Sequence, residues 1–213
     1  MQEVERYRKR AIVQHWWIVL CSLLLAITGM FLFVHWFGPA AWGGTSRIVH
    51  RVAAVGFVAV PVIYMILNPK SSLEWLKEAF TWGKADLGWL KSAPTYYFGF
   101  DIIPMPPQER SNTGQKMWMV VVITMSIVFV VSGGIMWFGK GLVPTGVFQW
   151  TVFAHDAAFV IAGAMFIVHV ALGAFHPRFS EALRSMITGK VSVHYAKDHH
   201  GKWYDRISSG KAE

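Results

Sequence analysis

Four histidines lie within or at the ends of segments that otherwise contain almost only apolar residues. They are His15, His50, His155 and His169. A titratable side chain inside an apolar helix is costly, so it usually has a partner or a function. Imidazole can bind a transition metal, relay protons or hydrogen-bond a neighbouring helix, and the spacing of the four residues has to distinguish these uses.

The spacing favours two pairs at two depths. His155 and His169 are 14 residues apart in one segment, which is about 21 Å along a helix, and their side chains point within about 40° of one face. In an up-and-down bundle, His50 matches the depth of His155, and His15 matches that of His169. Two imidazoles from facing helices, with room between them for a flat macrocycle, form a bis-histidine haem site, which transfers electrons and has no open position for oxygen.

The four histidines therefore predict two b-type haems. The single cysteine, Cys21, excludes a Cys-x-x-Cys-His attachment site and a cysteine-rich metal site. Three alternatives stay open: hydrogen bonds between helices, a proton relay, and a metal site to which only Asp156 would add a carboxylate. His35 is a reserve ligand on the outer side.

The segments that carry these histidines have the length of membrane spans. Only 15% of the residues are charged, against about 25% in soluble domains, and about 20 apolar residues cross a bilayer. The chain is predicted to be an all-α, integral membrane four-helix bundle. It comprises a domain of residues 1–177, with spans at about 12–34, 48–67, 117–138 and 152–175 and a cytoplasmic loop at 68–116, followed by a cytoplasmic tail at 178–213.

The basic residues divide unequally between the two sides of this bundle. If the N-terminus is inside, 17 Lys and Arg residues lie on the cytoplasmic side, and Arg47, Arg51 and Lys140 lie on the other. The positive-inside rule then places both termini in the cytoplasm of a multi-pass protein of the bacterial inner membrane. The net charge of +8 is accordingly interpreted as a topology signal and a contact with membrane lipids, not as a nucleic-acid surface.

Other residues have supporting roles or simpler explanations. Arg47 and Arg51 flank His50 and are candidates to bind haem propionates, or serve only to set the topology. Residues 71–91 of the loop predict an amphipathic helix, either in the membrane interface or packed on the protein. Three histidines of the polar tail are interpreted as solvated surface residues: His194, His199 and His200.

The arrangement resembles the cytochrome b (gamma) subunit of membrane-bound formate dehydrogenase. The resemblance extends from about Arg8 to Pro177. It rests on the four histidines and on the segment Asn112-Thr113-Gly114-Gln115-Lys116, which is similar to the quinone-site signature of that family. Related cytochromes b serve hydrogenase and thiosulfate reductase-type complexes, and these remain alternatives, as does a haem-free membrane scaffold.

The resemblance implies an electron-transfer and quinone-reducing subunit of a respiratory oxidoreductase, not the subunit that oxidises the substrate. An extracytoplasmic iron–sulfur subunit, joined to a catalytic subunit, would deliver electrons to the outer haem. Menaquinone or ubiquinone would accept them near the inner haem. Carried over by position, Asn112, Gly114 and Gln115 would line the quinone pocket, with His169 nearby. The residues alone offer a second explanation, in which Asn112 or Thr113 caps the third helix.

Overall fold

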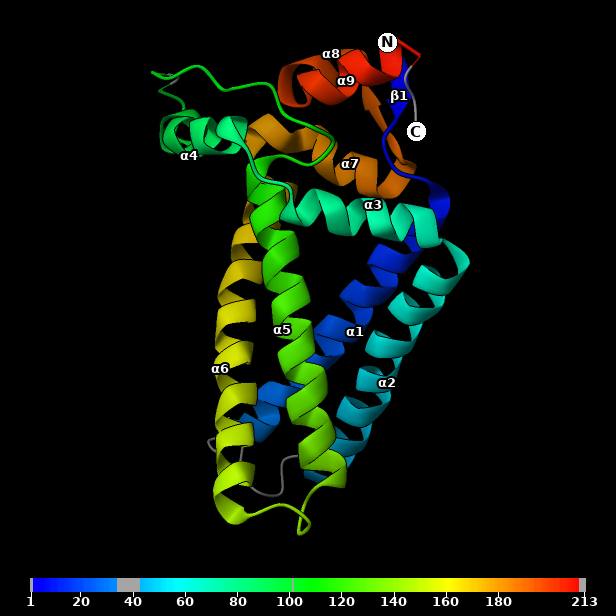
Figure 1. Cartoon of the computed structure of the whole chain (residues 1–213), viewed down its shortest axis with the longest axis vertical. Coiled ribbons are helices and arrows are strands. Elements are labelled where there is room, and N and C mark those ends of the chain that lie inside the picture. Colours follow the sequence, from blue (N-terminus) through cyan, green and yellow to red (C-terminus); the bar gives the residue numbers. More distant parts are fainter. Residues whose placement is uncertain (1, 34–42, 101, 211–213) are drawn as a thin grey trace. The chain divides into compact units, whose positions relative to one another are not determined.

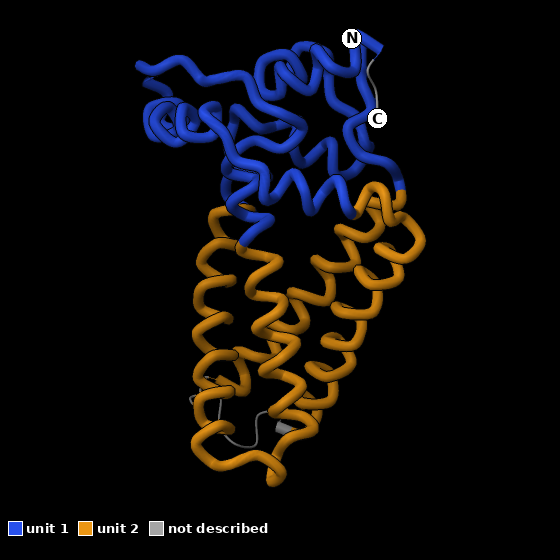
Figure 2. Tube along the Cα trace, in the orientation of Figure 1, with its two compact units in different colours: residues 1–9, 73–120, 170–213 blue, residues 10–72, 121–169 orange. Residues whose placement is uncertain are grey.

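The structure is a computed structural model that describes residues 2–33, 43–100 and 102–210 (Figure 1). These residues form two compact units (Figure 2). Unit 2 consists of residues 10–72 and 121–169, and unit 1 consists of residues 1–9, 73–120 and 170–213.

Four helices of the described chain are long and apolar enough to cross a membrane. They are α1 (Lys9–Phe33), α2 (Gly43–Leu67), α5 (Thr113–Phe138) and α6 (Thr145–Val170). Only 6 to 11% of the residues in their most apolar windows are buried, so most of these side chains face outward, as a hydrocarbon environment allows. The four predicted spans are confirmed as helices, each beginning three to seven residues before the predicted start, and the predicted end at residue 34 lies outside the described residues.

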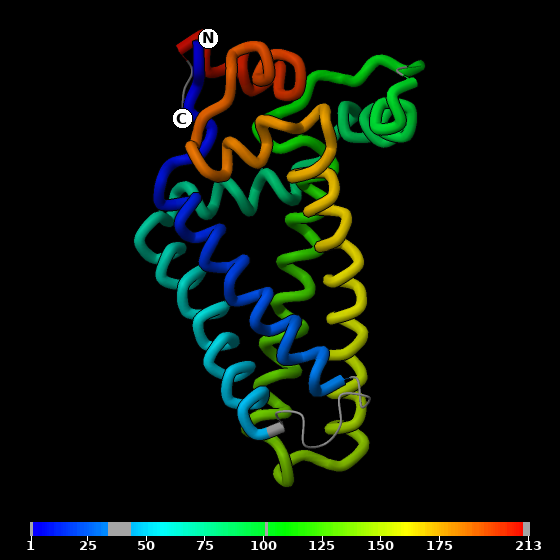
Figure 3. The backbone as a smooth tube through the Cα atoms, turned by 180° about the vertical axis from the view of Figure 1, so that it is seen from behind, coloured from blue at the N-terminus to red at the C-terminus, as the bar shows by residue number. Residues whose placement is uncertain are grey.

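The spanning parts of these helices form unit 2, in which consecutive helices run antiparallel (Figures 1 and 3). The α1 and α2 helices approach closely at Gly56, where an added Cβ would lie 3.2 Å from Cys21 Sγ. The Trp17 indole N–H also donates to the Gly56 carbonyl across 3.2 Å. Phe33 of α1 contacts Phe159 of α6, with ring centroids 6.4 Å apart. Small residues at such crossings let helix backbones approach each other in membranes.

Proline residues lie just beyond the ends of two spans. The α2 helix ends at Leu67, and Pro69 begins α3 (Pro69–Phe80), where its missing N–H costs nothing. The α6 helix continues as a π-helical turn (Ala171–Phe175), after which Pro177 begins a short 3₁₀ turn (Pro177–Phe179). The loop segment 71–91 is helical, as predicted, and is divided between α3 and α4 (Lys84–Tyr97).

Unit 1 joins the two ends of the chain through a small sheet. Strand β1 (Glu3–Glu5) pairs antiparallel with β2 (Lys190–Ser192), with Val4 opposite Val191. Three short helices accompany it: α7 (Ser180–Thr188), α8 (Val193–His199) and α9 (Gly201–Ser208). Their apolar core consists of Phe179, Val191, Tyr195, Ala196 and Trp203.

This packing corrects one interpretation of the tail histidines. His194 is exposed, as expected. His200 is only 1% exposed, and its Nδ1 lies 2.8 Å from the Glu109 carbonyl oxygen. His199 is half-buried, with Nδ1 3.1 Å from the Tyr96 hydroxyl. The expectation of a solvated ring is therefore wrong for His200, because the tail folds against residues more than 90 positions earlier in the chain.

Candidate haem and quinone sites

The predicted outer pair of histidines comes together in unit 2. His50 lies in the second turn of α2 and His155 in the third turn of α6. Their ring centroids are 6.3 Å apart, and the ring planes are tilted by 55°. An imidazole nitrogen binds a transition metal at about 2.0–2.1 Å, so two rings on opposite sides of one metal have centroids roughly 6 Å apart. The pair therefore has the ring separation that two histidines holding one haem iron would need.

Each ring of the outer pair has a hydroxyl and a glycine beside it. Thr28 Oγ1 lies 2.9 Å from His50 Nδ1, and Ser132 Oγ lies 2.8 Å from His155 Nδ1. The next residue in each case is a glycine: an added Cβ at Gly29 would lie 3.6 Å from His50 Cε1, and one at Gly133 would lie 3.7 Å from His155 Cε1. Each ring is thus held at Nδ1, on the side away from Nε2, by a neighbouring helix.

The predicted inner pair lies at the other end of the same unit. His15 is in the second turn of α1, and His169 is the penultimate residue of α6. The two imidazoles are close enough to interact electrostatically. His15 Nδ1 is buried and makes no hydrogen bond to any described residue. A buried polar nitrogen without a partner is costly, and in this respect His15 differs from His50 and His155, whose Nδ1 atoms each lie beside a hydroxyl.

Arg47 and Arg51, the candidates for propionate binding, are both exposed on α2. The Arg51 guanidinium lies over the Trp137 ring, with its central carbon 5.2 Å from the centroid. This cation–π contact joins α2 to α5. Arg51 therefore has a packing role that does not depend on a ligand.

The segment predicted to bind quinone lies in unit 1, at the start of α5. Asn112 and Gln115 form a reciprocal capping box. The Gln115 backbone N–H donates to Asn112 Oδ1 across 2.9 Å, and the Asn112 backbone N–H donates to Gln115 Oε1 across 3.0 Å. Arg6 also donates to Gln115 Oε1, at 3.3 Å. The predicted N-cap at Asn112 is confirmed, and the box employs the two side-chain oxygens but not the amide nitrogens.

Gly114 has a structural reason to be glycine. An added Cβ would lie 2.9 Å from Trp89 Cη2, and Trp89 is itself buried. The ring therefore packs directly on the α5 backbone at this position. His169, which the resemblance associates with the quinone, belongs to unit 2.

A buried ionic network that the sequence did not predict adjoins this segment. The Lys116 ammonium donates to Asp86 Oδ1 across 3.1 Å and to the Thr81 carbonyl across 3.0 Å. Thr113 Oγ1 donates to the same Asp86 oxygen across 2.8 Å. Burial opposes ionisation of Asp86, but the hydrogen bonds from Thr113, Gly83 and Lys116 and the lysine charge outweigh it and lower the carboxyl pKa. Asp86 and Lys116 are 30 residues apart in a polar part of the sequence, and no local pattern relates them. The contact could therefore not be predicted from the sequence.

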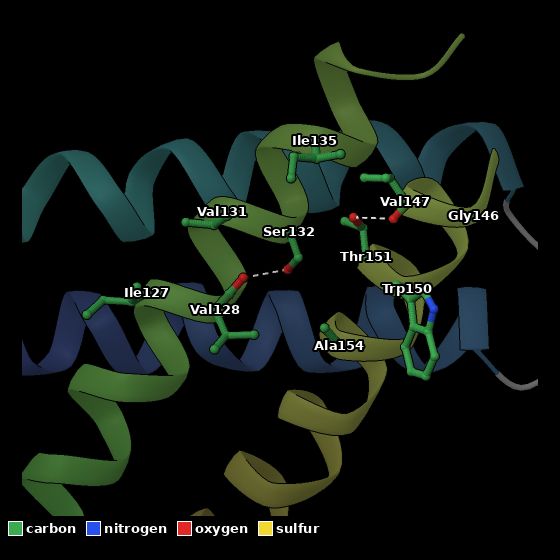
Figure 4. A pocket seen from close by; sticks show the side chains of 10 residues that line it. All are labelled: Ile127, Val128, Val131, Ser132, Ile135, Gly146, Val147, Trp150, Thr151 and Ala154. Atoms are coloured by element: carbon green, nitrogen blue, oxygen red, sulfur yellow. Dashed lines mark hydrogen bonds between the residues drawn. The ribbon is translucent and has the colours of Figure 1, made fainter. Parts of the chain in front are cut away.

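A groove of about 670 Å³ lies between α5 and α6 in unit 2 (Figure 4). Its walls are almost entirely apolar, because the hydroxyls of Ser132 and Thr151 donate to carbonyls of their own helices. The lining residues are Ile127, Val128, Val131, Ser132, Ile135, Gly146, Val147, Trp150, Thr151 and Ala154. Among the described residues, no cluster of three or more His, Cys, Asp or Glu could hold a metal ion.

Comparison with known proteins finds relatives that match nearly the whole chain. The nitrate-inducible formate dehydrogenase cytochrome b556(Fdn) subunit of Escherichia coli is 28% identical over 209 residues, which cover 93% of this chain and 89% of that protein. The formate dehydrogenase cytochrome b556 subunit of Haemophilus influenzae is 25% identical over 98% of this chain and 85% of its own length. A second subunit of Escherichia coli, the formate dehydrogenase cytochrome b556(fdo) subunit, is 23% identical over 96% of this chain and 93% of its own length.

The resemblance drawn from the histidines and the Asn112 segment is thereby confirmed. The relatives are subunits of formate dehydrogenases, and a cytochrome b of this kind holds haem b and transfers electrons. The model of one family matches residues 6–189, which include all four spans. The chain is a membrane cytochrome b that belongs to the prokaryotic cytochrome b561 family.

Proposed function

We propose that this chain is the dihaem membrane subunit of a respiratory oxidoreductase, most like formate dehydrogenase. It would receive electrons from an extracytoplasmic iron–sulfur subunit and pass them to a quinone near the cytoplasmic side. The observation that carries the proposal is the 6.3 Å separation of the His50 and His155 rings on facing helices. The relatives' status as formate dehydrogenase subunits supports the choice of partners.

The chain's own residues define what each site would do. His50 and His155 would hold the haem of the outer site, and His15 and His169 would hold that of the inner site. When bound, haem b accepts and releases one electron at a time at its iron. The helices keep the two sites at fixed depths, since His155 and His169 lie on one continuous helix about 21 Å apart along its axis.

The haem assignment is tested by counting haems in variants. Purified wild-type protein should contain two haems per chain with bis-histidine spectra. His155→Ala should lose one and His169→Ala the other, while His194→Ala, at an exposed histidine of the tail, should keep both. Retention of two haems in either of the first two variants would contradict the proposed ligand pairs.

For the quinone, we propose the amide nitrogens of Asn112 and Gln115 as donors to a quinone carbonyl. The capping box employs their oxygens, so the amide N–H groups are the atoms that a ligand would need. Gly114, between them, would let the quinone approach the backbone, although its contact with Trp89 already requires a glycine. Protons for quinone reduction would come from the cytoplasmic water.

Two near-isosteric substitutions separate binding from helix capping. Asn112→Asp and Gln115→Glu keep an oxygen for the capping box but remove the amide donor, so α5 should stay folded while quinone reduction and quinone-analogue affinity fall at least tenfold. Asn112→Ala, which removes the cap as well, should cost about 1 kcal/mol of stability in addition. Unchanged quinone reduction in both isosteric variants would exclude the amides from the site.

A further inference from the structure

The outer pair of histidines is held by two hydroxyls in the same way on two different helices. Thr28 Oγ1 lies 2.6 Å from the Leu24 carbonyl oxygen of its own helix and 2.9 Å from His50 Nδ1. Ser132 Oγ lies 2.5 Å from the Val128 carbonyl oxygen and 2.8 Å from His155 Nδ1. In both cases one helix supplies a hydroxyl followed by glycine, and the next spanning helix supplies the histidine.

These distances determine where the protons lie. A hydroxyl has one proton, and a carbonyl oxygen can only accept. Two oxygens 2.5–2.6 Å apart need a proton between them, so each hydroxyl donates to its carbonyl. The hydroxyl oxygen then accepts from the histidine, which requires a proton on Nδ1. Each neutral ring consequently has its free lone pair on Nε2, the nitrogen that a haem iron would bind.

In the inner pair, at least one histidine lacks such a hydrogen bond at Nδ1. His15 Nδ1 is buried without a hydrogen-bond partner among the described residues. Hydrogen bonding at the distal nitrogen fixes a ligating imidazole in place and makes it a stronger electron donor. A stronger donor stabilises the oxidised iron and lowers its reduction potential.

We propose that Thr28 and Ser132 are positioning residues for the outer haem: they fix the Nε2 lone pairs of His50 and His155 and lower the reduction potential of the haem bound between these rings. The inference rests on the proposed ligation by His50 and His155. The proposal also implies the direction of electron transfer, because a lower reduction potential at the outer haem favours electron flow toward the inner haem.

The test is a potentiometric titration of the purified holoprotein with optical detection. Thr28→Val and Ser132→Ala remove the hydroxyls with little change in volume, and each should shift one of the two midpoint potentials upward while leaving the other unchanged. The low-spin ferric signal of the same haem should change in electron paramagnetic resonance. Thr28→Ser and Ser132→Thr, which keep the hydroxyl, should restore both properties.

Thr151→Val is the matched control, since this hydroxyl also donates to a carbonyl of its own helix, at 2.8 Å. It should leave both potentials unchanged. Loss of one haem in Thr28→Val, with recovery in Thr28→Ser, would equally show that the hydroxyl holds the ligand.

Two unchanged potentials in a Thr28→Val/Ser132→Ala double variant that retains both haems would overturn the inference. The proposed function has its own criterion, the loss of one haem in His155→Ala. If His155→Ala loses a haem and the double variant shows no shift, only the role of the hydroxyls fails. If His155→Ala keeps both haems, the ligand assignment itself fails.

Discussion

The Lys116 ammonium and the Asp86 carboxylate form an ion pair of 3.1 Å, in which both side chains are only 8% exposed. Lys116 is the last residue of the segment proposed to bind quinone, and Asp86 lies near the start of α4. The carboxylate also accepts from Thr113 Oγ1 and from the Gly83 backbone N–H. The pair therefore connects the beginnings of α4 and α5, and its charges cannot be separated without leaving one of them buried.

Removing one partner of this pair should be strongly destabilising. We expect Asp86→Asn to cost about 3–5 kcal/mol, because it leaves the Lys116 charge uncompensated, while Asp86→Asn/Lys116→Met should recover much of the loss. Thermal unfolding of the purified chain measures both. Glu3→Gln, which breaks the more exposed pair with Arg184, is the control and should cost about 1 kcal/mol or less. Equal costs for Asp86→Asn and Glu3→Gln would contradict this prediction.

The contact between Gly114 and Trp89 predicts a second effect on stability. Gly114→Ala places a Cβ 2.9 Å from the Trp89 ring, which we expect to cost about 1–3 kcal/mol through overpacking. Gly134→Ala, also on α5 but with no atom within 4 Å of the added Cβ, should be neutral or slightly stabilising. The double variant Gly114→Ala/Trp89→Phe should recover part of the loss. No difference between the two alanine variants in thermal unfolding would rule out the steric explanation.

Two buried or half-buried histidines at the end of α8, His199 and the following His200, predict how unit 1 responds to pH. Burial lowers the pKa of His199 to about 4, and burial together with the Arg6 charge lowers that of His200 well below its ordinary value. Both groups ionise near 6.5 in the unfolded chain. The unfolded state therefore binds more protons below this pH, so stability is complete above about 6.5 and falls as the pH decreases toward 4.

For His199 alone this loss is about 3 kcal/mol over that range, from a pKa lowered to about 4. Unfolding temperatures at pH 7.5 and 5 measure the effect, and the difference between wild type and His199→Gln/His200→Gln isolates it. The double variant should show a clearly flatter pH dependence. His194→Gln, at an exposed histidine, should retain the wild-type slope. A wild-type slope in the double variant would show that these rings are not protonated on unfolding.

The distribution of basic residues predicts the orientation in the membrane. With 17 Lys and Arg residues on one side and three on the other, both termini should lie in the cytoplasm. A phosphatase that is active only outside the cytoplasm should be active when fused after Lys140 and inactive when fused after Gly210. The opposite pattern would invert the proposed electron path.

The sequence by itself determined that four apolar helices form and about where they end, and it predicts the pairing of the histidines by depth. These are local properties: hydropathy over about 20 residues defines a span, Pro69 and Pro177 interrupt helices, and the rise of 1.5 Å per residue separates His155 from His169. The N-cap at Asn112 was also predictable, because the capping box lies within four residues.

The tertiary structure decided which atoms surround these residues. Thr28 and His50 are 22 positions apart, and no periodicity relates a threonine on α1 to an imidazole on α2. The pairing of Val4 with Val191, and the burial of His200 beside Glu109, join segments whose sequences look like polar termini and loops. Contacts of this kind depend on how helices and strands that are far apart in the sequence pack against each other. Local patterns of hydropathy and spacing do not determine that packing.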